Sequence, residues 1–274
     1  MEIELVLNGG MVVRGTLSKP DTACAGVVVL IHGLGEHFGR YAGWAGRFLE
    51  RGFAVAGVDL PGHGISDGKR GHISSYRVAD NLIDELVKKA AAECHGVPVV
   101  LYGHSLGGGI VLRYLLSRKP GVACAVVTSP WLKLAFEPAA LKLILAMAVK
   151  KIAPAMVQPS GLNVNYLSRD KRVAAAYTSD PLVHDRISVS LFNEAVSSAA
   201  CSLKNRHELT IPLLLMHGAD DMITSPEGSR LFAEDSPEAF LKIWEGGYHE
   251  LHNDIIAGEV FEYIAGWLIK TLSD

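Results

Sequence analysis

The stretch that decides the fold is VPVVLYGHSLGGGIVLRYLLSRKP, residues 97–120. It begins with an apolar run from Val97 to Tyr102, which is typical of a strand buried in a sheet. The chain then turns through residues 103–107 and continues with apolar residues at helical spacing. The sequence therefore predicts a strand, a tight turn and a helix, with Ser105 at the tip of the turn.

Ser105 has a glycine two residues away on each side, in the pattern Gly-x-Ser-x-Gly. A turn this tight strains the serine backbone and leaves no room for side chains at Gly103 and Gly107. It also exposes the hydroxyl group where the strand ends and the helix begins, which is the geometry of a nucleophile elbow. The five-residue pattern recurs by chance, so the prediction depends on the strand and helix around it. The alternative is a serine that only caps the helix.

Buried strands and helices alternate around this stretch. A hairpin over residues 2–17 comes first, with its turn at Asn8-Gly9-Gly10. The strands expected next are 25–31, 53–60, 97–103 and 122–130, and the helices are 41–52, 75–94 and 107–118. This alternation predicts an α/β domain with a mostly parallel central sheet and helices on both of its faces.

The alternation breaks between residues 131 and 207, where helical patterns occur without a clear buried strand. It resumes with expected strands at 211–221 and 240–246 and helices at 226–235 and 255–272. An insertion at this place would lie over the carboxyl edge of the sheet, where ligands bind in open α/β folds. We therefore predict a core of residues 1–130 and 208–274 and a cap, or lid, of residues 131–207.

Part of this insertion, LKLILAMAVKKIAPAM at residues 141–156, is strongly apolar. It is short and is interrupted by Lys142, Lys150 and Lys151, so it does not fit a membrane span. Two compatible interpretations remain. The segment packs on the domain as a cap helix, or it lines an apolar substrate channel and touches a lipid surface transiently.

The composition is that of an ordinary globular protein. The 274 residues are 49% hydrophobic and 20% charged, with a net charge of −3. No cluster of Lys and Arg stands out, which argues against a nucleic-acid partner. Residues 1–15 lack the basic start and the unbroken apolar core of a secretion signal. We therefore expect a cytoplasmic protein, peripheral at the membrane if the cap contacts lipid.

The four cysteines, Cys24, Cys94, Cys124 and Cys201, are scattered and form no CxxC pair. Cys24 and Cys124 lie next to or within apolar runs, so we expect small buried apolar side chains in a reduced protein.

A serine nucleophile needs a base, and the base needs an acid that orients it. In this kind of fold the order along the chain is serine, acid, histidine. Asp221 and His249 each come just after an expected strand, so both should lie at the same edge of the sheet as Ser105. These three residues are the predicted catalytic triad.

Rival candidates exist for two of the positions. Asp220 is an alternative acid, but the Gly-x-x-Asp spacing from Gly218 favours Asp221. Asp180 is a weaker alternative because it falls in the insertion. His252 is an alternative base, which we expect at the start of the last helical region.

An oxyanion hole needs two backbone N–H groups close to the nucleophile. Leu106 follows Ser105 and supplies one. Leu34 supplies the other, from the loop HGLGEHFGR (residues 32–40) after an early strand. The glycine spacing of this loop does not fit a dinucleotide cradle, because it departs from GxGxxG and no helix starts at once.

The remaining histidines carry no metal motif. His32 and His63 lie in tight glycine turns and are expected to brace loops, and His104 is expected to pack beneath the nucleophile. His249 and His252 are three residues apart but have no companion carboxylate motif. We predict neither a metal nor a cofactor.

Six motifs in order carry a family resemblance: HGLGEHFGRY, DLPGHGISDGKRGHISSY, GHSLGGG, TSDPL, HGADD and GGYHELHND. Together they resemble the monoacylglycerol lipase and lysophospholipase branch of the α/β-hydrolases, from about residue 26 to the end. The resemblance implies the α/β-hydrolase fold, with a mobile cap over an apolar acyl tunnel. It also implies the same catalytic triad and the same two oxyanion donors.

The resemblance further implies that Glu36 and Arg40 fix the shape of the oxyanion loop. The chain has leucine at both oxyanion positions, where relatives often have Ala, Phe or Met. Only the backbone N–H is required, so the mechanism is unaffected and the shape of the pocket differs.

The expected function is that of a serine hydrolase, which cleaves carboxylic esters with an apolar acyl chain through an acyl-serine intermediate. Monoacylglycerol is the favoured substrate, followed by lysophospholipids and generic carboxylic esters. A thioesterase or a carbon–carbon bond hydrolase would use the same chemistry. A non-catalytic binding protein on this fold would usually have lost a member of the triad.

Overall fold

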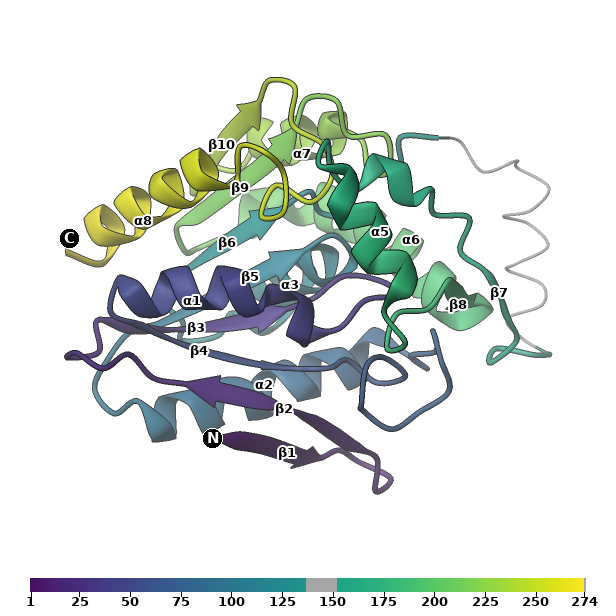
Figure 1. Cartoon of the computed structure of the whole chain (residues 1–274), viewed down its shortest axis with the longest axis horizontal. Helices are drawn as coiled ribbons and strands as arrows, with labels where there is room; N and C mark the ends of the chain where they lie inside the picture. The colour runs from purple at the N-terminus through teal and green to yellow at the C-terminus, as the bar shows by residue number, and fades with distance from the viewer. Residues whose placement is uncertain (137–151, 274) are drawn as a thin grey trace.

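The computed structural model describes residues 1–136 and 152–273. An eight-stranded sheet forms its centre, in the order β1-β2-β4-β3-β5-β6-β9-β10 (Figure 1). β1 pairs with β2 and β2 pairs with β4 in antiparallel fashion, and the other neighbouring strands are parallel. The predicted mostly parallel sheet is therefore confirmed.

The strands of the sheet are β1 (Glu2–Val6), β2 (Val12–Ser18), β3 (Gly26–Ile31), β4 (Phe53–Val58), β5 (Val99–His104), β6 (Cys124–Thr128), β9 (Leu213–Gly218) and β10 (Ala239–Trp244). The helices that cover the sheet are α1 (Ala42–Glu50), α2 (Tyr76–Glu93), α3 (Leu106–Arg118), α6 (Val189–Asn205), α7 (Pro226–Glu234) and α8 (Ala257–Ser273). Several strands end before their apolar runs do, because the chain turns away there to form the loops at the carboxyl edge.

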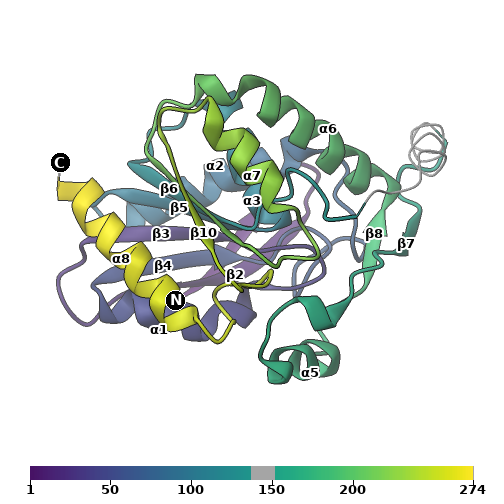
Figure 2. The ribbon, with the colours of Figure 1, turned by 90° about the horizontal axis from the view of Figure 1, so that it is seen from above.

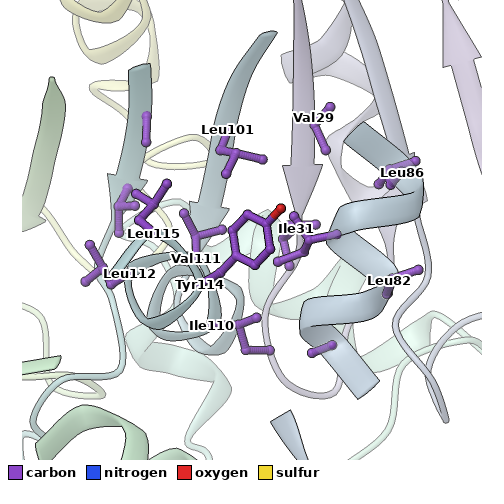
Figure 3. Packing of buried hydrophobic residues seen from close by; sticks show 14 of the residues in the cluster. Val29, Ile31, Leu82, Leu86, Leu101, Ile110, Val111, Leu112, Tyr114 and Leu115 are labelled. Atoms are coloured by element: carbon purple, nitrogen blue, oxygen red, sulfur yellow. The ribbon is translucent and has the colours of Figure 1, made fainter. Parts of the chain in front are cut away.

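The central strands β3, β4 and β5 are buried at every position, because helices cover both faces of the sheet. This explains the unbroken apolar runs in their sequences. In β3, Val27, Val29 and Ile31 pack with α2 and α3, and Figure 3 shows this side of the core. The alternate residues, Val28 and Leu30, pack on the opposite face with α1 and α8. Successive side chains of a strand point to opposite faces, so one six-residue strand contributes to both halves of the core.

Residues 131–207 contain α5 (Lys171–Ser179), α6 and two short antiparallel strands, β7 (Val157–Pro159) and β8 (Arg186–Ser188). α5 and the β7–β8 pair lie beyond the carboxyl edge of the sheet, whereas α6 packs against α3 and α7 (Figures 1 and 2). The β7–β8 pair differs from the expectation of no clear strand here. Three-residue strands are too short to show the alternation by which strands are recognised.

Most of the apolar stretch 141–156 lies outside the described residues. Of its described part, Ile152 is 88% exposed and Met156 is 46% exposed. In residues 1–136 and 152–273, no helix has both the length and the apolar character needed to cross a membrane.

Of the two cysteines expected to be buried, Cys124 is buried and Cys24 is only half-buried. Cys94 is also buried, but Cys201 is exposed. Cys201 lies on the outer face of the amphipathic helix α6.

Candidate active site

Ser105 occupies the turn between β5 and α3 with φ 54° and ψ −117°, a strained conformation for a residue with a side chain. A Cβ atom at Gly103 would lie 2.8 Å from the carbonyl oxygen of Gly107, and one at Gly107 would collide with the carbonyl oxygen of Ile31. The two glycines are therefore required by close backbone approach, as the nucleophile-elbow pattern predicts.

Ser105, His249 and Asp221 form a continuous hydrogen-bonded chain. The Nε2 atom of His249 lies 2.9 Å from the hydroxyl of Ser105, and its Nδ1 atom lies 2.7 Å from Oδ2 of Asp221. All three side chains are buried. They come from the loops after β5, β9 and β10, so the sheet brings together residues that lie up to 144 positions apart.

Backbone and hydroxyl donors hold the carboxylate of Asp221 in place. Its Oδ1 accepts hydrogen bonds from the N–H groups of Ile223 and Thr224 at 2.8 and 3.0 Å. Its Oδ2 accepts a further bond from the Thr224 hydroxyl at 2.9 Å. Burial alone would raise the pKa of Asp221, but the charge of His249 and the hydrogen bonds from His217 and His249 hold it well below its usual range. Asp221 is therefore ionised throughout the pH range in which enzymes of this kind work.

Asp221 also sets the protonation of His249. Burial would lower the pKa of His249, but the adjacent carboxylate of Asp221 outweighs burial and raises it. The Nδ1 atom faces a carboxylate oxygen and must carry a proton, which leaves Nε2 as the acceptor toward the Ser105 hydroxyl. This is the tautomer that a general base requires.

The two predicted oxyanion donors flank Ser105. Leu106 is the first residue of α3, and Leu34 lies in the loop after β3. Among the hydrogen bonds of the described residues, the N–H groups of Leu34 and Leu106 have no acceptor. Both groups are therefore available to an oxyanion, and the positive end of the α3 dipole lies at the same point.

Glu36 and Arg40 hold the oxyanion loop. Oε1 of Glu36 accepts hydrogen bonds from the Gly33 N–H at 2.6 Å and the Tyr41 hydroxyl at 2.7 Å. Oε2 of Glu36 binds the guanidinium of Arg40 at 2.5 Å. The same guanidinium binds both carboxylate oxygens of Glu250, the residue after His249. Arg40 lowers the pKa of Glu250 to about 2 against the effect of burial.

Among the described residues, the side chains of the rival candidates form no hydrogen bond with Ser105 or His249. Asp220 is exposed, and Asp180 binds His37 at 2.8 Å. His252 is buried and stacks on the ring of Tyr41 with centroids 4.5 Å apart. The expectation that His252 starts the last helical region is wrong, because α8 begins at Ala257 and a turn comes first.

The other histidines brace the fold. The Nε2 atom of His32 accepts the Leu60 N–H at 2.8 Å, and Nδ1 of His63 lies 3.0 Å from the Pro61 carbonyl oxygen. His104 is buried directly before Ser105, and its Nδ1 atom lies 3.0 Å from the Thr128 hydroxyl. Burial lowers the pKa of His32, His63 and His104, so all three are neutral. Within the described ranges, no group of three or more His, Cys, Asp or Glu side chains could hold a metal ion.

A cavity of about 600 Å³ opens at Ser105. This volume lies within the range of pockets that bind small molecules. Its walls are mainly apolar, with side chains from the core and from residues 131–207, among them Leu34, Trp131, Leu167, Ile187, Phe192 and Ile223. The apolar walls suit an alkyl chain better than a polar substrate.

The strand order of the sheet, together with the hydrogen-bonded residues Ser105, His249 and Asp221 at its carboxyl edge, defines a serine hydrolase of the α/β-hydrolase fold. A sequence model of the family described as serine aminopeptidase, S33, matches residues 22–255. A monoacylglycerol lipase of Mycolicibacterium smegmatis is 34% identical over 268 residues, which cover 96% of this chain and 95% of that protein.

The crystal structure of a monoacylglycerol lipase from Paleococcus ferrophilus superposes with a TM-score of 0.85. It is 36% identical, and the match covers 93% of this chain and 98% of that one. An uncharacterised abhydrolase-domain protein of Dictyostelium discoideum is also 36% identical, but the match covers only 27% of its longer chain. The chain therefore belongs to the monoacylglycerol lipase family of serine α/β-hydrolases, and the predicted fold and resemblance are confirmed.

Proposed function

We propose that this chain hydrolyses monoacylglycerols, with Ser105 as nucleophile, His249 as general base and acid, and Asp221 as the orienting acid. The observation that carries the proposal is the hydrogen-bonded chain from Asp221 to Ser105, which opens into a mainly apolar cavity. Two similar proteins, from Mycolicibacterium smegmatis and Paleococcus ferrophilus, are named monoacylglycerol lipases, which supports this substrate.

In the first half of the reaction, the Ser105 oxygen attacks the ester carbonyl carbon while Nε2 of His249 takes the hydroxyl proton. The carbonyl oxygen becomes an oxyanion and accepts hydrogen bonds from the Leu34 and Leu106 N–H groups. Each such donor typically stabilises the transition state by about 3 kcal/mol. The bond to the leaving alcohol then breaks, and His249 gives that alcohol its proton. This step leaves the acyl group on Ser105.

In the second half, His249 removes a proton from water, which attacks the acyl carbon through a second oxyanion. The bond to Ser105 breaks, the serine regains its proton from His249, and the fatty acid leaves. Asp221 keeps the imidazole in the required tautomer and stabilises its charged form during both steps. These steps use only protein groups and water.

Residues 131–207 are proposed to form the cap. Tyr177 of α5 and Ile187 of β8 line the cavity at Ser105, which supports a role in shaping the acyl site. Phe136 and Met156 line the same cavity and are also 51% and 46% exposed. Apolar side chains at the rim of a lipid-binding cavity favour a transient contact with a membrane surface. The proposed setting is a cytoplasmic enzyme, peripheral at the membrane, without a nucleic-acid partner.

A lysophospholipase or a generic carboxylesterase would use the same residues. The test is a matched substrate panel: monoacylglycerols of several chain lengths, lysophosphatidylcholine, a triacylglycerol, p-nitrophenyl esters, an acyl-thioester and an aminoacyl amide. The aminoacyl amide is included because the matching family model is described as serine aminopeptidase, S33, and an aminopeptidase cleaves such amides. The control is Ser105→Ala.

The expected result is the highest kcat/KM for a monoacylglycerol and its loss in Ser105→Ala. If kcat/KM is highest for lysophosphatidylcholine, this lipid replaces monoacylglycerol as the substrate. Activity confined to short p-nitrophenyl esters would show that the protein is a carboxylesterase and not a monoacylglycerol lipase. Full activity in Ser105→Ala would overturn the assignment of the nucleophile.

A further inference from the structure

The turn that follows β6 contacts the main chain of the nucleophile on both sides. β6 lies between β5 and β9 in the sheet and ends at Thr128. The Ser105 N–H donates to the Thr128 carbonyl oxygen at 3.0 Å, and the Trp131 N–H donates to the Ser105 carbonyl oxygen at 2.9 Å. The backbone of the elbow is thus held by residues 128–131.

Ser129, in the middle of this turn, contacts the two other loops of the triad. Its hydroxyl donates to the backbone carbonyl oxygen of His249 at 2.7 Å. Its own carbonyl oxygen lies 3.1 Å from the hydroxyl of Thr224, which is also 2.9 Å from Oδ2 of Asp221. One buried serine therefore connects the histidine loop to the loop that holds the acid.

The backbone conformation of Ser129 is one that a residue with a side chain rarely adopts. Its φ is 45°, in the left-handed region, and the residue is fully buried. Within the described part of the chain, only Ser105, Lys119 and Ser129 combine a side chain with positive φ. Glycine adopts this conformation more easily than serine. A serine here is explained by the hydrogen bond that its hydroxyl makes.

The two main-chain bonds made by the N–H groups of His249 and Glu250 run to the inserted segment. The His249 N–H donates to the Tyr166 carbonyl oxygen at 3.4 Å, and the Glu250 N–H donates to that of Leu167 at 2.7 Å. Ser129 instead belongs to the turn after a central strand. Its hydroxyl ties His249 to the rigid sheet, independently of residues 131–207.

We infer that Ser129 is a positioning residue, whose hydroxyl fixes the main chain at His249 and so keeps Nε2 in reach of the Ser105 hydroxyl. The inference rests on the proposed triad and adds to it a residue that touches neither the substrate nor the reacting atoms. Its effect is on geometry. Displacement of a catalytic group by about 1 Å can slow a reaction by about 100-fold.

Two variants separate the hydroxyl from the backbone. Ser129→Gly removes the hydroxyl and fits the left-handed backbone, whereas Ser129→Ala removes the hydroxyl and keeps the strain. The matched control is Ser190→Ala. The Ser190 hydroxyl is also buried and donates to a backbone carbonyl oxygen, that of Ser74, at the same 2.7 Å.

The measurements are kcat and KM on the best ester substrate, the rate of Ser105 labelling by a serine-directed phosphonate, and thermal unfolding. In Ser129→Gly and Ser129→Ala, we expect kcat and the labelling rate to fall about 10- to 100-fold, with KM changed less than about twofold. In Ser190→Ala, kcat and the labelling rate should equal those of the unaltered protein.

Two outcomes would overturn the inference. If Ser129→Gly unfolds at a lower temperature but keeps its kcat, the hydroxyl serves stability alone. If Ser129→Gly is fully active and Ser129→Ala is not, the backbone conformation matters and the hydroxyl does not. If Ser129→Ala does not fold, Ser129→Gly still decides the question. If the unaltered protein cleaves none of the esters, the proposed substrate fails, while phosphonate labelling still tests Ser129.

Discussion

Arg40 binds both carboxylate oxygens of Glu250, at 2.7 and 2.8 Å, although the two residues are 210 positions apart. The pair joins the oxyanion loop to the loop of the proposed base, because Arg40 also binds Glu36 and Glu250 follows His249 directly. The guanidinium also lies 4.7 Å from the ring centroid of Tyr177 in α5. A single cation therefore connects the two loops on either side of Ser105 with a helix of the proposed cap.

Replacement of Arg40 by methionine should unfold the protein more easily and reduce its activity. The substitution leaves Glu36 and Glu250 buried without their cation, a defect that typically costs about 3–5 kcal/mol. Chemical denaturation should show this loss in the free energy of unfolding. The control is Arg51→Met, which breaks the exposed pair with Glu262 and should cost less than about 1 kcal/mol. Equal losses in the two variants would contradict the structural role of Arg40.

Glu250→Gln should shift the pH dependence of the reaction toward acid. The nearby charge of Glu250 contributes to the raised pKa of His249. Glu250 is ionised at all pH values above about 2, so the glutamine removes a negative charge in the working range. The pKa of His249 then falls, and its neutral, basic form persists to lower pH. The acid limb of kcat/KM against pH should therefore move to lower pH.

The matched control for this shift is Glu262→Gln, which removes an exposed carboxylate paired with Arg51. Its acid limb should stay where it is in the unaltered protein. An acid limb in Glu250→Gln that moves upward, or does not move, would show that the charge of Glu250 does not act on His249.

Asp221→Asn should abolish most of the activity while leaving the fold intact. The amide keeps the shape of the carboxylate but can donate to Nδ1 of His249 and so favours the wrong tautomer. In a serine protease, this change lowers kcat by about 10⁴-fold. We expect a loss of similar size here, measured as kcat on the best ester, together with slow phosphonate labelling of Ser105. Asp220→Asn, one residue away and exposed, should remain active.

The sequence alone predicts the parts of the site that depend on local patterns. Ser105, Asp221 and His249 each come just after an apolar run, and parallel strands place their carboxyl ends at one edge. The strong alternation of buried strands and helices therefore determines where these three residues lie. The glycines at 103 and 107 are recognisable for the same reason, because the turn that needs them is local.

The rest of the site depends on contacts that no local pattern reveals. The Arg40–Glu250 pair joins residues 210 positions apart, and the bond from Ser129 to His249 spans 120 positions. Glu250 has a sequence signal only in being next to His249. Ser129 is one of many serines at the end of a strand, and its positive φ appears only in the structure. Likewise, the outer position of Cys201 follows from how α6 packs on α3.

Gly107→Ala should reduce activity more than its single added methyl group suggests. The new Cβ atom would collide with the backbone carbonyl oxygens of Ile31 and His32, which lie at the end of β3 and the start of the oxyanion loop. Main chain cannot move aside as a flexible side chain can, so the elbow and the loop with Leu34 must separate. The two oxyanion donors would then no longer fit one oxygen atom. Loss of one donor typically lowers kcat by about 10²- to 10³-fold.

The measurement that checks this prediction is kcat on the best ester, with Gly46→Ala as the control. Gly46 lies in α1, where an added Cβ atom meets nothing within 4 Å, and alanine favours a helix more than glycine does. Gly46→Ala should therefore keep its activity and unfold at an equal or higher temperature. If Gly107→Ala retains full kcat, the spacing between the elbow and the oxyanion loop is not critical, and the assignment of Leu34 as a donor loses its main geometric support.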